Sequence, residues 1–187
     1  KILALNACDF GDLILHCVSI FENKQDILNI YSNNFKYILV DEYQDTNFIQ
    51  SKWLNLLTNK HKNICCVGDD DQSIYSWRGA EIKNFLNFDQ LYKNSKKIKL
   101  EQNYRSTQNI LSAASGLISK NLGRLGKKLW TNGEDGELVK LNHYKNGKDE
   151  AINVSDIIEK KLKNKFSYNK IAILVRAIFQ TREFEER

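Results

Sequence analysis

The sequence predicts an α/β fold in which parallel strands are covered by helices. Short apolar runs at residues 37–40 and 64–67 indicate strands, and segments with apolar positions at helical spacing alternate with such runs. Because both runs are continuously apolar, we expect both faces of these strands to be buried. The first run ends abruptly in two adjacent carboxylates, which marks the end of a strand as a candidate site.

The remaining elements follow from periodicity and from helix-capping or helix-breaking residues. Asn47 is placed to cap one helix and Ser106 to cap another. The expected helices are residues 10–21, 48–58, 81–87, 107–119 and 150–163, with another from residue 180 onward. The expected strands are residues 37–40, 64–67, 98–100, 137–144 and 171–175, with an extended segment at residues 73–77.

Length and the chain ends indicate pieces of two structural units. The 187 residues contain no Met, so we expect an interior part of a longer protein. The lysine-rich stretch at residues 92–97 is expected to link the two units, which we take as residues 1–94 and 95–187.

Composition narrows the class of protein. Charged residues make up 27% of the chain and hydrophobic residues 42%, as in ordinary globular proteins. The net charge of +5 is compatible with a polyanionic partner, and a solvated lysine-rich surface explains it nearly as well. No apolar run approaches the roughly 20 residues that span a bilayer, and no signal peptide opens the chain, so we expect no membrane contact.

The four cysteines favour a reducing, cytoplasmic setting over a metal site. They lack CxxC spacing, so zinc is not predicted. Cys65 and Cys66 lie in the apolar run at residues 64–67 and are expected to pack as small buried side chains.

Asp41 and Glu42 are the first candidate site residues. Two ionised carboxylates side by side repel each other, and a Mg²⁺ ion held by one or two carboxylates plus phosphates would offset that repulsion. We therefore expect these two residues to contact a metal and a nucleotide. The alternative is a solvated acidic turn.

A second group of candidates begins at Gln72, whose amide could orient a water or touch a phosphate. Tyr75 and Trp77 could stack on unpaired bases, and Arg78 could add a cation–π or phosphate contact. On one extended strand, Gln72 and Trp77 would lie about 16 Å apart, which would link a nucleotide site mechanically to a nucleic-acid site. The alternative makes the two aromatic residues part of the core.

Arg105 and Tyr104 form the third group, between an expected strand and an expected helix. A guanidinium there could reach a γ-phosphate and stabilise charge in the transition state. Tyr104 could stack on a base or simply pack. The alternative pairs Arg105 with Glu101 or with a helix end.

Taken together, these segments resemble motifs of the UvrD/Rep/PcrA-like superfamily 1 DNA helicases. The sequences DEYQD at residues 41–45, GDDDQSIYSWRGA at 68–80 and QNYRST at 102–107 resemble motifs II, III and IV in order and spacing. Weaker likenesses are DFGDL at residues 9–13, EA at 150–151, and the segments at 171–176 and 180–182. The resemblance covers essentially the whole chain.

The resemblance implies RecA-like parallel sheets of the P-loop NTPase type, in parts of two motor domains. It also implies the activity of an ATP-dependent 3'–5' DNA helicase or translocase, with ATP and Mg²⁺ as cofactors. The implied partners are single-stranded and duplex DNA, in repair or replication, and the rest of the same chain.

The resemblance further implies a role for each matched position. The implied roles are Mg²⁺ binding by Asp41, with Glu42 beside it as the general base; γ-phosphate sensing by Gln72; phosphate contact by Arg105; adenine contact by Tyr104; and DNA contact by Tyr75, Trp77, Arg78 and Arg176.

Two departures from the family pattern limit what the resemblance implies. Ile178 stands where the family often has an Asn that contacts DNA. No GxxxxGK[ST] occurs, so the phosphate loop is expected upstream of Lys1, and residues 1–187 alone are expected to hydrolyse ATP poorly or not at all. The alternatives are the motor of a helicase–nuclease and a non-catalytic remnant that binds single strands.

Overall fold

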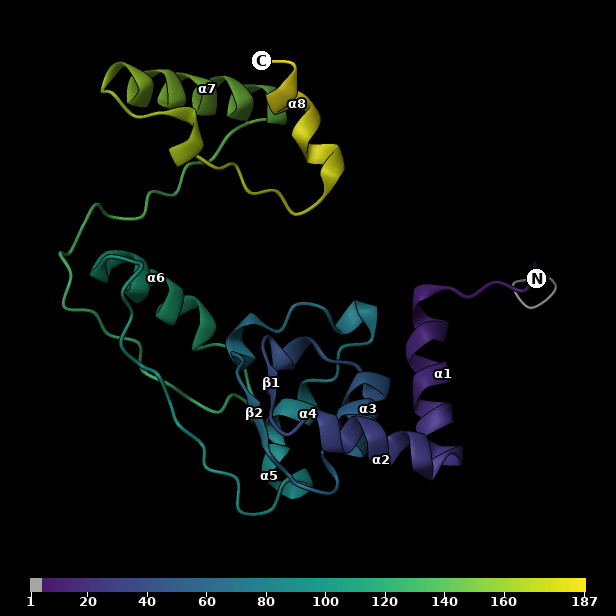
Figure 1. The fold of residues 1–187 in the computed structure, drawn as a ribbon. Coiled ribbons are helices and arrows are strands. Elements are labelled where there is room, and N and C mark those ends of the chain that lie inside the picture. The colour runs from purple at the N-terminus through teal and green to yellow at the C-terminus, as the bar shows by residue number, and fades with distance from the viewer. Residues whose placement is uncertain (1–4) are drawn as a thin grey trace. The chain divides into compact units, whose positions relative to one another are not determined.

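The sheet of the first unit consists of two parallel strands. The computed structural model describes residues 5–187 and pairs β1 (Ile38–Val40) with β2 (Ile64–Cys66), in the register Ile38 to Ile64 and Val40 to Cys66 (Figure 1). Both strands lie within the predicted runs. A parallel pair joined through a helix agrees with the predicted α/β class.

The chain divides into two compact units, one ending at Gly136 and the other covering Glu137–Arg187. The boundary that we expect between residues 94 and 95 separates parts of two motor domains, which is a different division from that of the compact units. It stays a prediction. None of the described helices is both long and apolar enough to cross a membrane.

The described part of the first unit, residues 5–136, contains six α-helices, and four of them were predicted to within two residues at each end. The helices are α1 (Phe10–Asn23), α2 (Gln25–Asn34), α3 (Phe48–Thr58), α4 (Ile82–Leu86), α5 (Phe88–Leu91) and α6 (Gln108–Ile118). Sequence reasoning missed α2, whose asparagines are poor helix formers, and the short α5. In α2, burial of Leu28 in the core offsets the weak local preference.

Side-chain caps fix where two of these helices begin. Asn47 accepts the backbone N–H of Gln50, and the Gln50 side chain accepts the backbone N–H of Asn47, each at 2.9 Å. This reciprocal pair satisfies two donors that a helix start leaves free, and it confirms the predicted cap. The predicted cap at Ser106 is wrong, because α6 begins one residue later and its N-cap is Thr107, without a side-chain bond.

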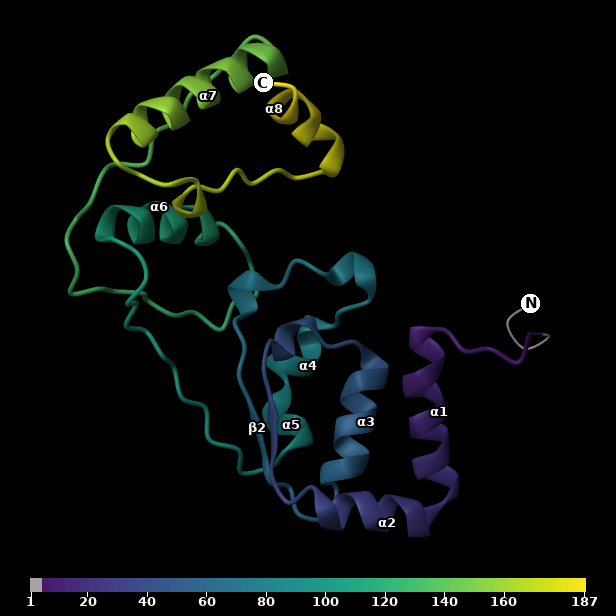
Figure 2. The same ribbon diagram turned by 45° about the horizontal axis from the view of Figure 1, so that its top comes forward.

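The core of the first unit lies where three helices meet one face of the sheet. Phe21 of α1, Leu28 of α2 and Leu57 of α3 are buried together, and Ile38 of β1 and Trp53 pack against them. Burying such an apolar side chain contributes roughly 1.5–3 kcal/mol. Figure 2 shows α1 and α3 side by side, with α2 running across their ends.

The opposite face of the sheet is exposed, contrary to prediction. Leu39 keeps 80% of its surface exposed, and Cys65 is also exposed, because both point away from the helices that cover Ile38. Side chains alternate between the faces of a strand, so a continuous apolar run does not by itself require cover on both sides. The expectation that both cysteines are buried is wrong for Cys65, and Cys66 is half-buried.

An aromatic cluster holds the segment that follows β1 against α5. Tyr43 is 1% exposed and meets the Phe88 ring edge-on at 5.7 Å between centroids. Tyr92 stacks on Phe88 at 4.7 Å, and its hydroxyl lies 3.0 Å from the Thr58 hydroxyl. Tyr92 is therefore part of the core, and the expected linker at residues 92–97 begins only after it.

Three predicted strands and the extended segment do not form as expected. Residues 73–77 are interrupted by a 3₁₀ helix at Ser76–Arg78, and residues 98–100, 137–144 and 171–175 form no strand in the part of the chain that is described. A strand needs a partner for its backbone groups. Near residues 98–100, only an isolated bridge between Gln102 and Trp130 forms.

In the second unit, α7 (Gly147–Lys163) packs against α8 (Arg182–Glu185). Asn146 caps α7 by accepting the backbone N–H of Asp149 at 2.9 Å, which starts the helix three residues before the predicted position. Acidic residues lie in the first turn of α7 and lysines in the last, as the helix dipole favours. Ala151 is buried on its inner face.

Candidate functional site

Asp41 and Glu42 follow β1 at a sharp change in backbone direction. Glu42 has φ 50° and ψ 41°, in the left-handed region. Its backbone N–H donates to Asp41 Oδ1 at 2.9 Å, and both side chains are exposed. For a residue other than glycine, this conformation costs roughly 1–2 kcal/mol. The turn orients two accessible carboxylates at the carboxyl end of the strand.

Gln44 connects this turn to the loop after β2. Its Nε2 donates to Glu42 Oε2 at 2.7 Å, and its Oε1 accepts the backbone N–H of Asp69 at 3.0 Å. The side chain is buried, with 1% of the residue exposed. Sequence reasoning gave Gln44 no role, although an amide two residues after a carboxylate in the matched motif was the available signal.

Gln72 extends the same hydrogen-bonded chain. Its Nε2 donates to Asp69 Oδ2 at 2.8 Å, within the 3₁₀ helix η3 (Asp70–Gln72) and its cap. Three hydrogen bonds thus lead from Glu42 through Gln44 and Asp69 to Gln72. Two of the predicted site residues, from separate motifs, are brought into one network.

Gly68 leaves the space that Gln44 occupies. A Cβ at position 68 would lie 2.6 Å from Gln44 Oε1 and 2.8 Å from Phe85 Cε2. Both separations are too short for non-bonded atoms. The absence of a side chain at position 68 therefore allows the two loops to meet.

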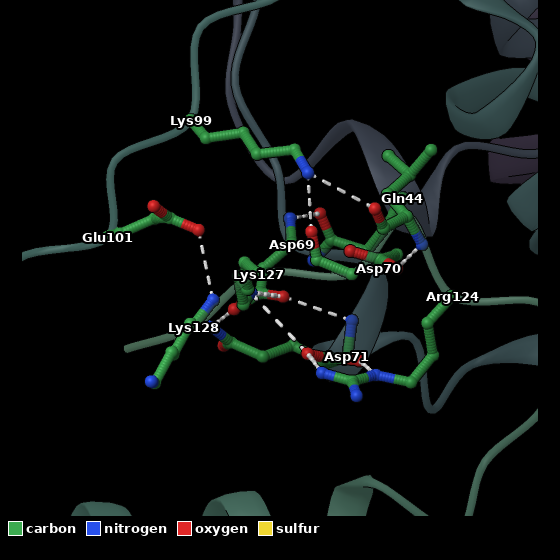
Figure 3. Close-up of polar contacts among 12 residues, drawn as sticks. Gln44, Asp69, Asp70, Asp71, Lys99, Glu101, Arg124, Lys127 and Lys128 are labelled. Carbon is green, nitrogen blue, oxygen red and sulfur yellow. Dashed lines mark hydrogen bonds and ion pairs between the residues drawn. The ribbon is translucent and has the colours of Figure 1, made fainter. Parts of the chain in front are cut away.

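Residues 69–71, here called the acidic turn, place carboxylate oxygens within 4.8 Å of one another. Like charges this close need cations nearby. Residues 124–128, here called the basic segment, supply them, since Lys127 pairs with Asp69 and Arg124 with Asp71 (Figure 3). Sequence reasoning treated the basic segment only as a failed match to a phosphate loop and missed this contact.

Opposing effects act on the carboxyl group of Asp69. Burial raises the pKa of Asp69, but the hydrogen bonds from Lys127 and Gln72 and the positive charge of Lys127 outweigh burial. Its pKa therefore lies below the ordinary value, so Asp69 is ionised at neutral pH and accepts from Gln72 as a carboxylate.

Tyr75, Trp77 and Arg78 form a surface cluster just beyond the acidic turn, in which Trp77 and Arg78 are exposed. The Arg78 guanidinium carbon lies 4.8 Å from the Tyr75 ring centroid and 4.6 Å from that of Trp77. Trp77 is 68% exposed, which excludes the alternative that it is a core residue, whereas Tyr75 is half-buried. A 3₁₀ helix replaces the predicted rigid strand. The separation of about 16 Å between Gln72 and Trp77, which assumed an extended chain, therefore does not apply.

The side chains of Tyr104 and Arg105 form no hydrogen bond or ion pair with this network among residues 5–187. Tyr104 is 85% exposed and donates to Gln102 Oε1 at 2.7 Å. Arg105 is exposed, and among the described residues no ion pair joins it to Glu101, whose carboxylate accepts the backbone N–H of Lys128. Arg176 is an exposed residue of the second unit. Its expected role and those of Tyr104 and Arg105 stay predictions.

An open pocket of about 610 Å³ lies along β1 and α3. Its wall is largely apolar, with Ile14, Trp53 and Leu54 among its members, and Asp41 and Glu42 also line it. The two carboxylates are therefore accessible beside a hollow surface.

Comparison with known proteins gives two adjoining domain matches. Residues 1–93 match the UvrD/REP helicase N-terminal domain, and residues 98–187 match the UvrD-like helicase C-terminal domain. Over 187 residues, the chain is 50% identical to a probable DNA helicase II homolog of Rickettsia conorii, covering 100% of the chain and 29% of that protein.

Other relatives agree with these matches. A DNA helicase II of Rickettsia typhi is 48% identical over 187 residues, covering 100% of the chain and 28% of the relative. An ATP-dependent DNA helicase PcrA of Staphylococcus epidermidis is 47% identical over 180 residues, covering 96% of the chain and 25% of the relative. The chain thus spans less than a third of the length of these proteins. Because two domains of one family match in succession along nearly all of the sequence, the chain belongs to the UvrD-like helicase family.

Proposed function

We propose that this chain contributes part of the ATP site and part of the DNA path of an ATP-dependent DNA helicase. The observation that carries the proposal is the hydrogen-bonded chain from Glu42 through Gln44 and Asp69 to Gln72. It joins a candidate base to a candidate phosphate sensor through the buried Gln44 and the half-buried Asp69. The names of the relatives, DNA helicase II and PcrA, support the same activity.

In this proposal, Asp41 and Glu42 face the metal and the attacking water. Exposed carboxylate oxygens at the end of a strand suit Mg²⁺, which prefers oxygen ligands. Asp41 would hold the ion, with Glu42 beside it, and bound Mg²⁺ would neutralise charge on the phosphates. Glu42 would accept the proton of the water. The hydrogen bond from Gln44 fixes one of the two Glu42 oxygens and leaves the other free for this task.

Gln72, Arg105 and Tyr104 complete the proposed nucleotide contacts. Gln72 would sense the γ-phosphate, Arg105 would contact the same phosphate from the second motor domain, and Tyr104 would lie near the adenine. RecA-like motor parts at residues 1–94 and 95–187 belong to this proposal, as does a phosphate loop supplied by the rest of the same chain.

The surface cluster supports a DNA path beside the nucleotide site. Tyr75, Trp77 and Arg78 would hold single-stranded DNA by stacking and by phosphate contact, and Arg176 would add a further contact. Cycles of ATP binding and hydrolysis would then move the strand in the 3'–5' direction and open duplex DNA, in repair or replication.

Two other functions remain as alternatives. A helicase–nuclease would use the same motor, and its nuclease carboxylates would lie outside this sequence. A non-catalytic remnant would keep the aromatic cluster without ATP turnover. Steady-state ATP hydrolysis by the full-length protein, with and without DNA, separates the remnant from both motors.

The substitution Glu42→Gln in the full-length protein tests the proposed chemistry. The amide oxygen can still accept from Gln44, but the group cannot take a proton from water. We expect ATP binding to persist while turnover falls by at least about a hundredfold. Asp26→Asn, an exposed carboxylate of α2, is the matched control and should leave turnover unchanged. Full turnover by Glu42→Gln would overturn the assignment.

A further inference from the structure

Arg124 of the basic segment contacts one end of the acidic turn with a defined geometry. Its Nε and Nη2 donate to the two oxygens of Asp71, both at 2.6 Å. The side chains are 21% and 11% exposed, so water screens this pair only in part. A bidentate pair of this kind fixes orientation as well as distance.

Lys127 contacts the other end of the acidic turn, where its ammonium group pairs with Asp69. Between these two anchors, the backbone N–H of Leu125 donates to Asp70 Oδ2 at 2.8 Å. Lys99, labelled in Figure 3, in turn donates to the Leu125 carbonyl at 3.2 Å and so holds the basic segment from a second stretch of the chain. All three aspartates of the acidic turn are therefore engaged by one stretch of five residues.

These contacts argue against a divalent cation as the partner of the acidic turn. Both oxygens of Asp71 already accept from Arg124, and Asp69 accepts from Lys127 and Gln72. A metal ion would have to displace protein donors that neutralise the same charge. The acidic turn is thus a docking site for the chain's own basic segment.

We propose that the basic segment is a latch that positions Gln72. Arg124 and Lys127 hold the acidic turn, and Asp69 transmits the constraint through its 2.8 Å hydrogen bond from the Gln72 amide. The latch comes from the stretch that matches the C-terminal family domain, whereas the acidic turn lies in the N-terminal match. The importance of this positioning for catalysis rests on the function proposed above for Gln72.

The latch makes the orientation of Gln72 depend on a segment some 55 residues away in the sequence. When the basic segment is seated, Asp69 is held between Lys127 and Gln72, and the amide of Gln72 keeps one orientation. When the basic segment leaves, Asp69 loses its cation and the 3₁₀ turn loses its outer support. Arg124 and Lys127 are therefore positioning residues, since they act through Asp69 and not on substrate.

Adjacent lysines provide a matched pair of variants for the test. Lys127→Ala removes a latch contact, whereas Lys128→Ala removes an exposed lysine whose backbone N–H, not its side chain, contacts Glu101. Arg124→Ala and Arg124→Lys complete the set, because lysine keeps the charge without the bidentate geometry. All variants are made in the full-length protein, and the thermal unfolding midpoint of each is recorded.

Hydrogen exchange of the peptide containing residues 69–76 tests the latch without reference to activity. We expect exchange to be at least about tenfold faster in Arg124→Ala and Lys127→Ala, intermediate in Arg124→Lys, and unchanged in Lys128→Ala. Unchanged exchange in both alanine variants would overturn the latch. A lower thermal unfolding midpoint together with faster exchange throughout the first unit would show that these residues have a general role in folding. That result would also overturn the latch.

ATP turnover then tests the positioning of Gln72. We expect kcat with DNA to fall about tenfold in Arg124→Ala and Lys127→Ala while KM for ATP changes less than about twofold, because Arg124 and Lys127 pair with the acidic turn and are not among the proposed nucleotide contacts. Normal kcat despite faster exchange would overturn the positioning role. Absence of turnover in the unsubstituted protein would instead overturn the proposed function, and hydrogen exchange would still decide whether the latch exists.

Discussion

The buried side-chain oxygen of Gln44 accepts the backbone N–H of Asp69 at 3.0 Å, so one amide joins the loops that follow the two parallel strands. These loops carry the candidate base Glu42 and the candidate sensor Gln72. Hydrogen bonds, as well as the sheet, therefore couple the conformation of each loop to that of the other.

Gly68→Ala should displace Gln44 and lower both stability and turnover. The added Cβ would lie 2.6 Å from Gln44 Oε1, and overpacking of this kind costs about 1–3 kcal/mol. Gly116→Ala is the matched control, because nothing lies within 4 Å of its Cβ in α6 and alanine is the better helix former by about 0.5–1 kcal/mol. The thermal unfolding midpoint should therefore fall in Gly68→Ala and rise in Gly116→Ala. Equal midpoints would contradict the close approach.

Trp77→Ala should weaken the binding of single-stranded DNA without unfolding the protein. The ring is 68% exposed, so little core packing is lost, while a base that stacks on an aromatic ring gains roughly 1–3 kcal/mol. Fluorescence anisotropy with a labelled oligonucleotide measures the change in Kd. Phe10→Ala removes another exposed ring, 91% accessible, and should leave Kd unchanged. A similar loss in both variants would argue against a specific contact.

The contact between Asp69 and the latch should weaken in acid and persist at neutral pH. The pKa of Asp69 is lower in the folded protein than the ordinary value of 3.8, because its cation and hydrogen bonds outweigh burial. The stabilisation is therefore present above about pH 3.8 and is lost as the pH falls below that value through the folded pKa.

The difference in thermal midpoint between the unsubstituted protein and Asp69→Asn measures this contribution. It should be constant from neutral pH down to about pH 5 and should shrink below the ordinary pKa of 3.8. A difference that grows with acidification would have the wrong sign.

Cys66 should react with alkylating reagents far more slowly than its neighbour Cys65. Burial raises the pKa of Cys66 to about 12, with a smaller contribution from Cys65, so its thiolate is scarce near pH 8. Cys65 is exposed on the uncovered face of β2. Timed labelling with iodoacetamide followed by peptide mass spectrometry compares the two directly. Equal rates would show that the thiol of Cys66 is accessible.

Local patterns predicted the elements whose partners lie close in the sequence. The helix after Asn47 and the two parallel runs follow from capping and from apolar character, and they form as predicted. The failures depend on distant partners. Residues 171–175 have the composition of a strand but pair with no strand among residues 5–187, and Leu39 belongs to an apolar run with helices on one side only.

The candidate site shows the same division. Motif order pointed to Glu42 and Gln72 as candidates, but the connections through Gln44 and Asp69 depend on backbone geometry that no local pattern encodes. The latch was missed for a related reason, since Arg124 and Asp71 are 53 residues apart and complementary charge alone does not select a partner. Contacts between residues so far apart in the sequence can be found only once the structure shows which segments the fold brings together.

Under the function proposed above, the left-handed backbone at Glu42 makes position 42 a site of conflict between stability and activity. Glycine would adopt φ 50° at lower conformational cost, so Glu42→Gly would relax the turn while it removes the carboxylate. A stabilising substitution found by selection at this position would therefore be expected to remove the base proposed above, which is a trade of activity for stability. Any effort to make this protein more robust should leave this turn untouched.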